Sequence, residues 1–153
     1  MTTQKKYKLL KNDTKKTPDG KTLLRIQALI DFSIFKKGEK GGYIEKEDNL
    51  SQEGDAWVSE DARVYGDAQV YGDARVYWNA QVYGNARVFG DAWVYGDAWV
   101  SGDARVYGNA RVFGNARVYG RFDLTVSIDY ELPRIVIDTD KKLKKLKEFL
   151  ETF

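Results

Sequence analysis

Small aliphatic residues recur every six positions through the middle of the chain. Alanine occupies every sixth position from 56 to 116, and a valine follows two residues after each alanine. A period of six is too short for helical repeats and is typical of short β-strands wound into a coil. Because alternate side chains of a strand face opposite sides, alanine and valine share one face, which we expect to form the core.

The polar and aromatic positions of the repeat alternate with its apolar positions, so we expect them to face outward. Arginine, glutamine or tryptophan separates each alanine from its valine, and usually an aromatic residue follows the valine. Glycine and then aspartate or asparagine mark each corner, since Asn and Asp tolerate left-handed backbone and bond to nearby backbone groups. Only small aliphatic side chains are left for the interior, so we expect no ligand cavity there.

Residues 1–41 predict an N-terminal β-hairpin. Residues 7–10 indicate a strand, and the sequence Thr-Pro-Asp-Gly at 17–20 is a strong turn signal. Apolar and polar residues then alternate from Leu24 to Phe32, which predicts a half-buried strand paired with the first. We expect the lysines of the hairpin to protect a solvated strand edge, with a phosphate-binding patch as the alternative: Lys5, Lys6, Lys8, Lys11, Lys15, Lys16 and Lys21.

Both ends of the repeat depart from its motif. Ile44 and Leu50 stand twelve and six residues before Ala56, and Asn49 falls at the Asp/Asn place, so a degenerate first coil is expected to begin near Gly42. The repeat region is therefore predicted to span 42–121.

The remaining residues, 122–153, predict strands and a last α-helix. Apolar residues alternate from 122 to 130, and a helix with one apolar face can begin after a cap at Asp138, Thr139 or Asp140. An open β-helix end exposes apolar core, so we expect the helix to cap it. A basic amphipathic membrane helix is the weaker alternative.

The segment Val64-Tyr65-Gly66-Asp67-Ala68 and its repeats resemble the hexapeptide-repeat family. The resemblance covers roughly 42–120 and implies an all-β fold, a left-handed parallel β-helix of about four to five triangular coils with three hexapeptides each. Tyrosine after the aliphatic residue and a glycine displaced by one place depart from the family pattern. The Gly-Asn-Ala-Arg-Val style looks most like uncharacterised, acetyltransferase-like hexapeptide proteins of bacteria and phages.

One face of this coil is the candidate binding surface. If a coil holds eighteen residues, positions eighteen apart stack about 4.8 Å apart. The face that begins with Trp57 is then the most aromatic, and it adjoins a corner where Glu60 and Trp78 replace glycine. Trp, Tyr and Arg dominate protein interfaces, so we expect a protein partner or a second copy to bind here, unless the rings and guanidiniums only stack within the chain. The residues of this predicted site are Trp57, Arg75, Tyr77, Trp78, Trp93, Tyr95, Arg111 and Phe113.

The composition of the chain argues against catalysis, metal binding and nucleic-acid binding. The resemblance makes an acyltransferase the enzymatic candidate, with histidine as general base, but the chain has no histidine, so we expect no catalytic residue and no cofactor. The mixture of Asp and Asn at the corners favours carboxylates that cap their own backbone over a metal site. A net charge of +2 makes nucleic acid an unlikely partner, although a binder of a nucleotide or single strand stays an alternative.

These observations predict a non-catalytic binding or scaffold protein. The chain has no cysteine and no apolar leader or membrane span in its sequence, so a cytoplasmic location without membrane attachment is expected. The resemblance to phage-borne proteins suggests a phage or prophage accessory factor that engages a host component.

Overall fold

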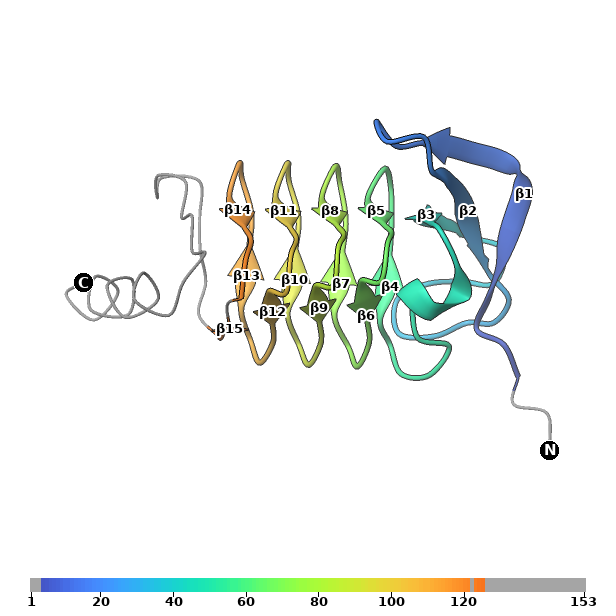
Figure 1. The fold of residues 1–153 in the computed structure, drawn as a ribbon. Coiled ribbons are helices and arrows are strands. Elements are labelled where there is room, and N and C mark those ends of the chain that lie inside the picture. The colour runs from blue at the N-terminus through green and yellow to red at the C-terminus, as the bar shows by residue number, and fades with distance from the viewer. Residues whose placement is uncertain (1–3, 122, 126–153) are drawn as a thin grey trace.

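The fold is a parallel β-solenoid with an antiparallel sheet at its N-terminal end (Figure 1). The computed structural model describes residues 4–121 and 123–125. The C-terminal elements predicted after residue 125, including the capping helix, lie outside the described residues. Within those residues, no helix is long and apolar enough to cross a membrane.

Each coil of the solenoid contributes one two-residue strand to each of three faces, and residues eighteen apart pair in parallel, as between Trp57 and Arg75. The predicted columns are therefore confirmed, whereas the left hand of the coil stays a prediction. Face one consists of β4 (Trp57–Val58), β7 (Arg75–Val76), β10 (Trp93–Val94) and β13 (Arg111–Val112). Face two contains β5 (Arg63–Val64), β8 (Gln81–Val82), β11 (Trp99–Val100) and β14 (Arg117–Val118). Face three contains β6 (Gln69–Val70), β9 (Arg87–Val88), β12 (Arg105–Val106) and β15 (Asp123–Leu124).

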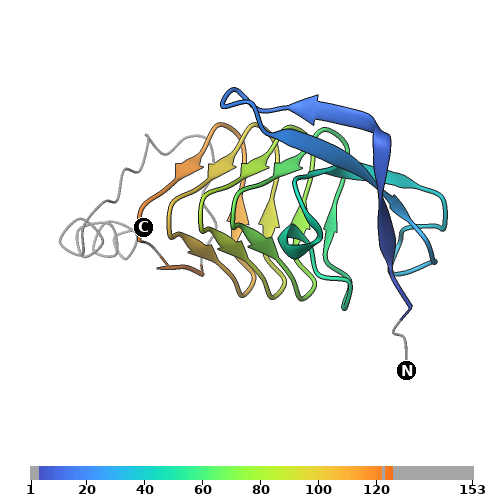
Figure 2. The ribbon, with the colours of Figure 1, turned by 45° about the vertical axis from the view of Figure 1, so that its right-hand side comes forward.

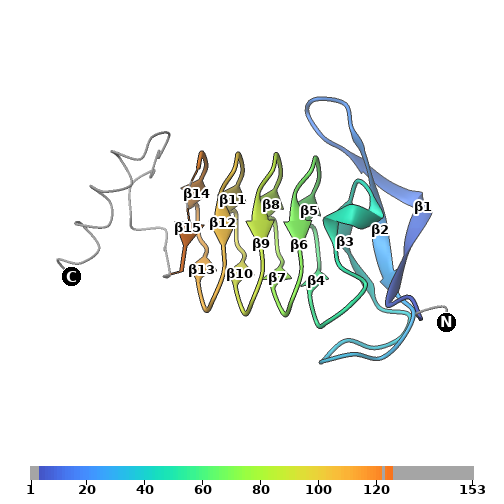
Figure 3. The same cartoon turned by 60° about the horizontal axis from the view of Figure 1, so that its bottom comes forward.

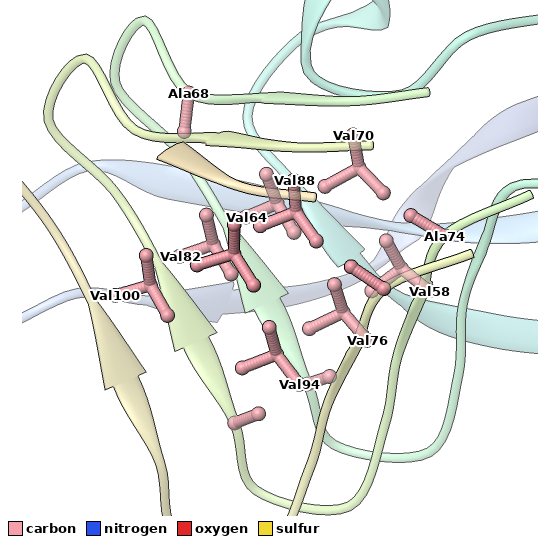
Figure 4. Packing of buried hydrophobic residues seen from close by; sticks show 14 of the residues in the cluster. Val58, Val64, Ala68, Val70, Ala74, Val76, Val82, Val88, Val94 and Val100 are labelled. Atoms are coloured by element: carbon pink, nitrogen blue, oxygen red, sulfur yellow. The ribbon is translucent and has the colours of Figure 1, made fainter. Parts of the chain in front are cut away.

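The core consists of the alanine and valine columns. Every alanine and valine of the repeat is buried. Figure 4 shows valines of successive coils, such as Val76 and Val94, projecting into the same interior. The prediction that these two residue types fill the inside of the coil is confirmed.

The N-terminal strands continue the sheet of face two (Figures 2 and 3). β1 (Tyr7–Lys16) and β2 (Thr22–Ala28) form the predicted hairpin, and Gly20 N donates to Thr17 O at 2.9 Å in its turn. β2 pairs antiparallel with β3 (Lys40–Ile44), which runs parallel to β5. The second strand ends at Ala28 and not at Phe32, because the chain then turns back toward face one.

The first coil is longer than the repeat. Ile44 pairs with Val64, and Leu50 pairs with Val70, each across twenty residues, where later coils use eighteen. Ile44 and Leu50 therefore occupy the valine place and not the alanine place that their spacing to Ala56 indicated. The short 3-10 helix η1 (Glu47–Asn49) lies between them.

Donor side chains close the N-terminal end of the solenoid. Each coil donates its backbone N–H groups to carbonyls of the next coil, as from Arg75 N to Ala92 O at 2.9 Å, so the first coil presents unpaired carbonyls. Lys6 Nζ donates to Ala56 O at 2.7 Å and to Gly54 O at 3.1 Å. Lys6 was expected on a solvated edge, but this role leaves its side chain only 2% exposed.

Asn49 closes a second part of the same end. Its Nδ2 donates to Ala68 O at 2.9 Å and to Gly66 O at 3.1 Å, and its Oδ1 accepts from Lys46 N. Asn49 was expected at the Asp/Asn place of the first coil, and it is buried because it replaces a missing coil as hydrogen-bond donor.

The corner amides and carboxylates bond between coils. Asn79 Nδ2 donates to Asp97 Oδ1, and Asn85 Nδ2 donates to Asp103 Oδ1, each at 3.1 Å. These contacts correct the expectation that each corner side chain caps its own backbone. At these two corners Asp and Asn alternate along the coil axis, so an amide separates neighbouring carboxylates, whereas Asp55, Asp73 and Asp91 follow one another at the third corner.

Candidate functional site

A turn from the N-terminal region covers the start of face one. Phe32 and Phe35 close this turn with two backbone hydrogen bonds, of 3.1 and 2.8 Å. Their ring centroids lie 5.0 and 5.6 Å from that of Trp57. Tyr7 packs edge-on against Trp57, with the ring centroids 6.1 Å apart.

The sequence had indicated that Trp57 is an exposed binding residue, and the structure shows that it is buried. Its side chain is 1% exposed, because residues far away in the sequence fold over it. Its indole Nε1 has no hydrogen-bond partner among the described residues. The residue is covered by the turn and Tyr7 and contributes to the candidate surface only where it lines the groove described next.

A groove of about 280 Å³ lies between this turn and face one. Ile34 stands in the turn itself and is 68% exposed. Arg75 is the charged residue of the lining, and the remainder is mostly aromatic or aliphatic. The lining consists of Ile34, Phe35, Trp57, Ser59, Arg75, Tyr77 and Trp93.

Arg75 connects the turn with the face. Its guanidinium lies 5.6 Å from the ring centroid of Phe35 and 5.6 Å from that of Trp93. Its Nη2 donates to Ser33 Oγ at 2.9 Å. Arg111 stacks on the same Trp93 ring at 4.0 Å, so the predicted stacking of arginine on tryptophan is present along face one.

Beside the groove, two corner residues have a backbone conformation that L-residues avoid. Glu60 and Trp78 have φ angles of 58° and 60°, whereas the other corners of the described coils use glycine. At the equivalent Gly96, a Cβ atom would meet Gly114 N at 3.0 Å. A left-handed conformation costs roughly 1–2 kcal/mol in a residue with a Cβ atom, so two adjacent strained corners need an explanation.

Trp78 joins the strained corner to the aromatic surface. Its side chain is 51% exposed, and its ring contacts Tyr77 and Tyr95 edge-on at 5.5 and 5.8 Å. Its backbone N–H donates to Glu60 Oε2 at 2.9 Å. Trp78 and Ile34 are the exposed large hydrophobic residues of the described chain, and both lie at or beside the groove.

A stacked ladder extends this surface along the coil axis. Tyr77 and Tyr95 stack at 4.9 Å, and Tyr95 and Phe113 stack at 5.1 Å, with nearly parallel rings. Burial between neighbouring rings raises the pKa of the Tyr77 hydroxyl. Seven of the eight residues predicted from the sequence thus lie on one continuous surface, and Trp57 lies beneath it.

The groove also contains residues that sequence reasoning missed. Ile34 and Phe35 come from the turn, and Ser59 directly follows the strand of Trp57. The signal for the turn was available, since three apolar residues crowd into positions 32–35 outside the repeat. Apolar and polar residues alternate up to Phe32, and this pattern predicted a continuing strand where the structure has the turn.

Two other hollows of the described surface are weaker candidates for a binding site. A hollow of about 530 Å³ on face three holds Arg87, Arg105 and Arg121, but Asp103 and Asp123 line it as well and offset their charge. Another, of about 460 Å³, lies beside the 3-10 helix and includes Glu47 and Asp48. Neither contains a strained residue or a large exposed apolar side chain.

The comparisons with known proteins concern the coils. A family described as YdcK Beta solenoid repeat matches residues 68–79, 80–96, 98–112 and 110–122. No curated protein matches the chain. The matched stretches contain Arg75, Tyr77, Trp78 and Trp93, but the turn and Trp57 precede them. The stacked coils and the repeat matches together identify the chain as a repeat β-helix protein of the β-solenoid type.

Proposed function

We propose that the protein is a non-catalytic binding protein that engages a protein partner through the groove and the ring of Trp78. The observation that carries this proposal is a tryptophan at a corner that favours glycine, with half of its side chain exposed. Tryptophan, tyrosine and arginine are the residues that supply most binding energy in protein interfaces. This surface concentrates all three.

The strain at Trp78 supports a role beyond folding. Its two edge-on contacts, with Tyr77 and Tyr95, contribute about 0.5–1.5 kcal/mol each, which is of the same order as the roughly 1–2 kcal/mol cost of the left-handed backbone. Internal packing thus accounts for the buried half of the tryptophan and not for the half that is exposed. A partner that covers the exposed half of the ring accounts for it.

The size of the groove favours a protein over a small ligand. Pockets for cofactors and drug-sized molecules typically measure about 300–1,000 Å³, so this groove, at about 280 Å³, is at the small end of that range. It suits a side chain of a partner, anchored beside a larger flat contact. An acyltransferase is disfavoured because the chain has no histidine to serve as general base.

The setting that we propose is an accessory protein of a phage or prophage that engages a host component in the cytoplasm. The resemblance of the Gly-Asn-Ala-Arg-Val repeats to hexapeptide proteins of bacteria and phages supports it. The lack of cysteine agrees with a reducing compartment.

The test compares two tryptophan variants. Trp78→Gly restores the residue of the other corners, and Trp99→Gln, the matched control, places on face two the residue that stands at Gln81 in the same column. Tagged wild-type protein and both variants are incubated with bacterial lysate, and retained proteins are identified by mass spectrometry. We expect a partner retained by wild type and Trp99→Gln and lost with Trp78→Gly. Equal retention by all three proteins, or none by wild type, would contradict the proposal.

A further inference from the structure

The inference concerns the chemistry of the partner and rests on the proposed function. Arg75 lines the groove, yet within the described residues no carboxylate lies within 4.0 Å of its guanidinium. Cations around the N-terminal sheet do have such partners, as Lys21 has Glu45 and Arg25 has Asp13. The lining of the groove therefore holds a positive charge and no carboxylate, and the nearby Glu60 carboxylate accepts from Trp78 N at the corner.

The guanidinium of Arg75 is already held in place. The rings of Phe35 and Trp93 flank it, and Ser33 Oγ accepts one of its hydrogen bonds. A guanidinium has five N–H donors in a rigid fork, so most of them remain for a ligand. Little side-chain freedom is left to lose on binding, which favours affinity.

The turn beside the groove carries two lysines and two carboxylates, so its formal charges cancel. Its two carboxylates are directed into its own backbone, since Asp31 Oδ1 accepts from Lys37 N at 2.7 Å and Glu39 Oε2 accepts from Lys36 N at 3.1 Å. The side chains of Lys36 and Lys37 are exposed. The charge that an acidic partner complements is thus that of Arg75, and the two exposed lysines lie near it in the turn.

Apolar walls strengthen an ion pair with Arg75. The rings and Ile34 surround the guanidinium, and a segment bound there would exclude water, which raises the strength of a charge-assisted hydrogen bond. The same walls need an apolar side chain against them to be covered. A ligand with only an apolar side chain leaves the guanidinium without a counter-charge, and a ligand with only a carboxylate leaves the apolar walls uncovered.

We propose that the groove binds a peptide segment of the partner in which an aspartate or glutamate stands next to a large apolar residue. The apolar side chain lies against Ile34 and Trp93, and the carboxylate pairs with Arg75. Arg75 thus determines the specificity of the site, while the rings and Trp78 supply the apolar contact.

A peptide selection tests this proposal. A library of random peptides displayed on phage is selected against wild type, Arg75→Gln and Trp78→Gly. Glutamine already occurs at the equivalent positions 69 and 81, so Arg75→Gln keeps a residue that the repeat accommodates. We expect wild type to enrich peptides with neighbouring apolar and acidic residues, and Arg75→Gln to enrich apolar residues without the acid.

Synthetic peptides make the result quantitative. The best peptide and its Glu→Gln or Asp→Asn counterpart are titrated while the tryptophan fluorescence is recorded. Wild type should bind the acidic peptide at least tenfold more tightly than the amide, with a preference that falls as salt is added, and Arg75→Gln should bind both about equally.

The outcomes separate this inference from the proposed function. If wild type selects apolar peptides without acidic residues, or if Arg75→Gln keeps the acidic preference, the inference is overturned and the proposed function stands. If wild type enriches nothing, or Trp78→Gly enriches the same peptides equally well, the proposed function itself is overturned and the inference with it.

Discussion

At the scale of single residues, the corners of the solenoid show which positions follow the backbone requirement for glycine and which depart from it. The repeat places glycine wherever the backbone has a positive φ, and only Glu60 and Trp78 break this rule in the described coils. These two residues stack directly, eighteen positions apart, and Trp78 N donates to Glu60 Oε2. The sequence located both exceptions, and the structure shows that they retain the strained conformation.

Glycine at position 60 should stabilise the protein. Glu60→Gly removes a left-handed strain of roughly 1–2 kcal/mol and loses an exposed hydrogen bond and some chain stiffness, so we expect a gain of about 0.5–1 kcal/mol in the free energy of unfolding. Urea denaturation of wild type and Glu60→Gly measures this difference in the free energy of unfolding. The opposite change, Gly72→Ala, is the control and should destabilise, because φ is 69° there and the new Cβ would meet Gly90 N at 3.0 Å. A loss of stability in Glu60→Gly would contradict this account of the corners.

Lys6 should give the protein an unusual dependence of stability on pH. Burial lowers the pKa of Lys6 from 10.5 to about 8. Between these values the unfolded chain binds more protons than the folded chain, so the free energy of unfolding rises with pH. Burial raises the pKa of Tyr65 from 10.0 to about 12 and also raises that of Tyr7, so stability falls again above about pH 10 as the unfolded tyrosines ionise.

The test is a series of urea titrations across this range. Wild type should become more stable from about pH 8 to pH 10, and Lys6→Met should lose that rise. The variant should also be less stable overall, because carbonyls such as Ala56 O lose their donor. An identical slope in both proteins would show that Lys6 does not titrate as described.

At the scale of elements, the sequence predicted the parts that repeat and missed the parts that do not. A period of six sets the inward and outward faces, and the resemblance to hexapeptide-repeat proteins implies three repeats to a coil. Together they predicted the columns from Trp57 to Arg111. The turn that ends at Phe35 could not, because it packs on Trp57 through contacts between distant segments. The burial of Lys6 was missed for a related reason, since it depends on which backbone groups the end of the coil leaves unpaired.

Removal of the turn's buried ring should expose Trp57. Phe35→Ala deletes a ring that packs on this indole, and we expect a loss of about 3 kcal/mol in stability together with a red-shifted, more readily quenched tryptophan fluorescence. Phe113→Ala, a half-buried ring farther along the ladder, is the control and should leave the quenching of Trp57 unchanged. Unchanged fluorescence in Phe35→Ala would mean that the turn does not shield Trp57.

At the scale of the whole molecule, the solenoid is a stack of similar coils that contact mainly their neighbours. Stability in such arrays is close to a sum of coil and interface terms. The coils after Trp93 repeat the register without contributing to the lining of the groove. The turn that holds Ile34 and Phe35, the first three strands of face one and the residues directly after those strands contain everything that lines it.

A whole coil should therefore be removable. Deletion of residues 97–114 joins Gly96 to Asn115, restores the motif and keeps the eighteen-residue register. We expect a folded protein with lower stability and a smaller urea m-value that retains partner binding. Deletion of residues 97–105, half a coil, breaks the register and should prevent cooperative folding. Equal behaviour of the two deletions would contradict a register set by eighteen residues.

The most direct test of the central claim is a binding titration with the isolated partner, because the claim assigns partner recognition to the Trp78 surface. Wild type, Trp78→Gly and Trp99→Gln are compared, with thermal melts of all three as a check on folding. Loss of the exposed ring should weaken binding at least tenfold in Trp78→Gly, a typical hot-spot effect, while its melt stays close to that of wild type and Trp99→Gln binds normally. Equal affinity of wild type and Trp78→Gly would contradict the claim.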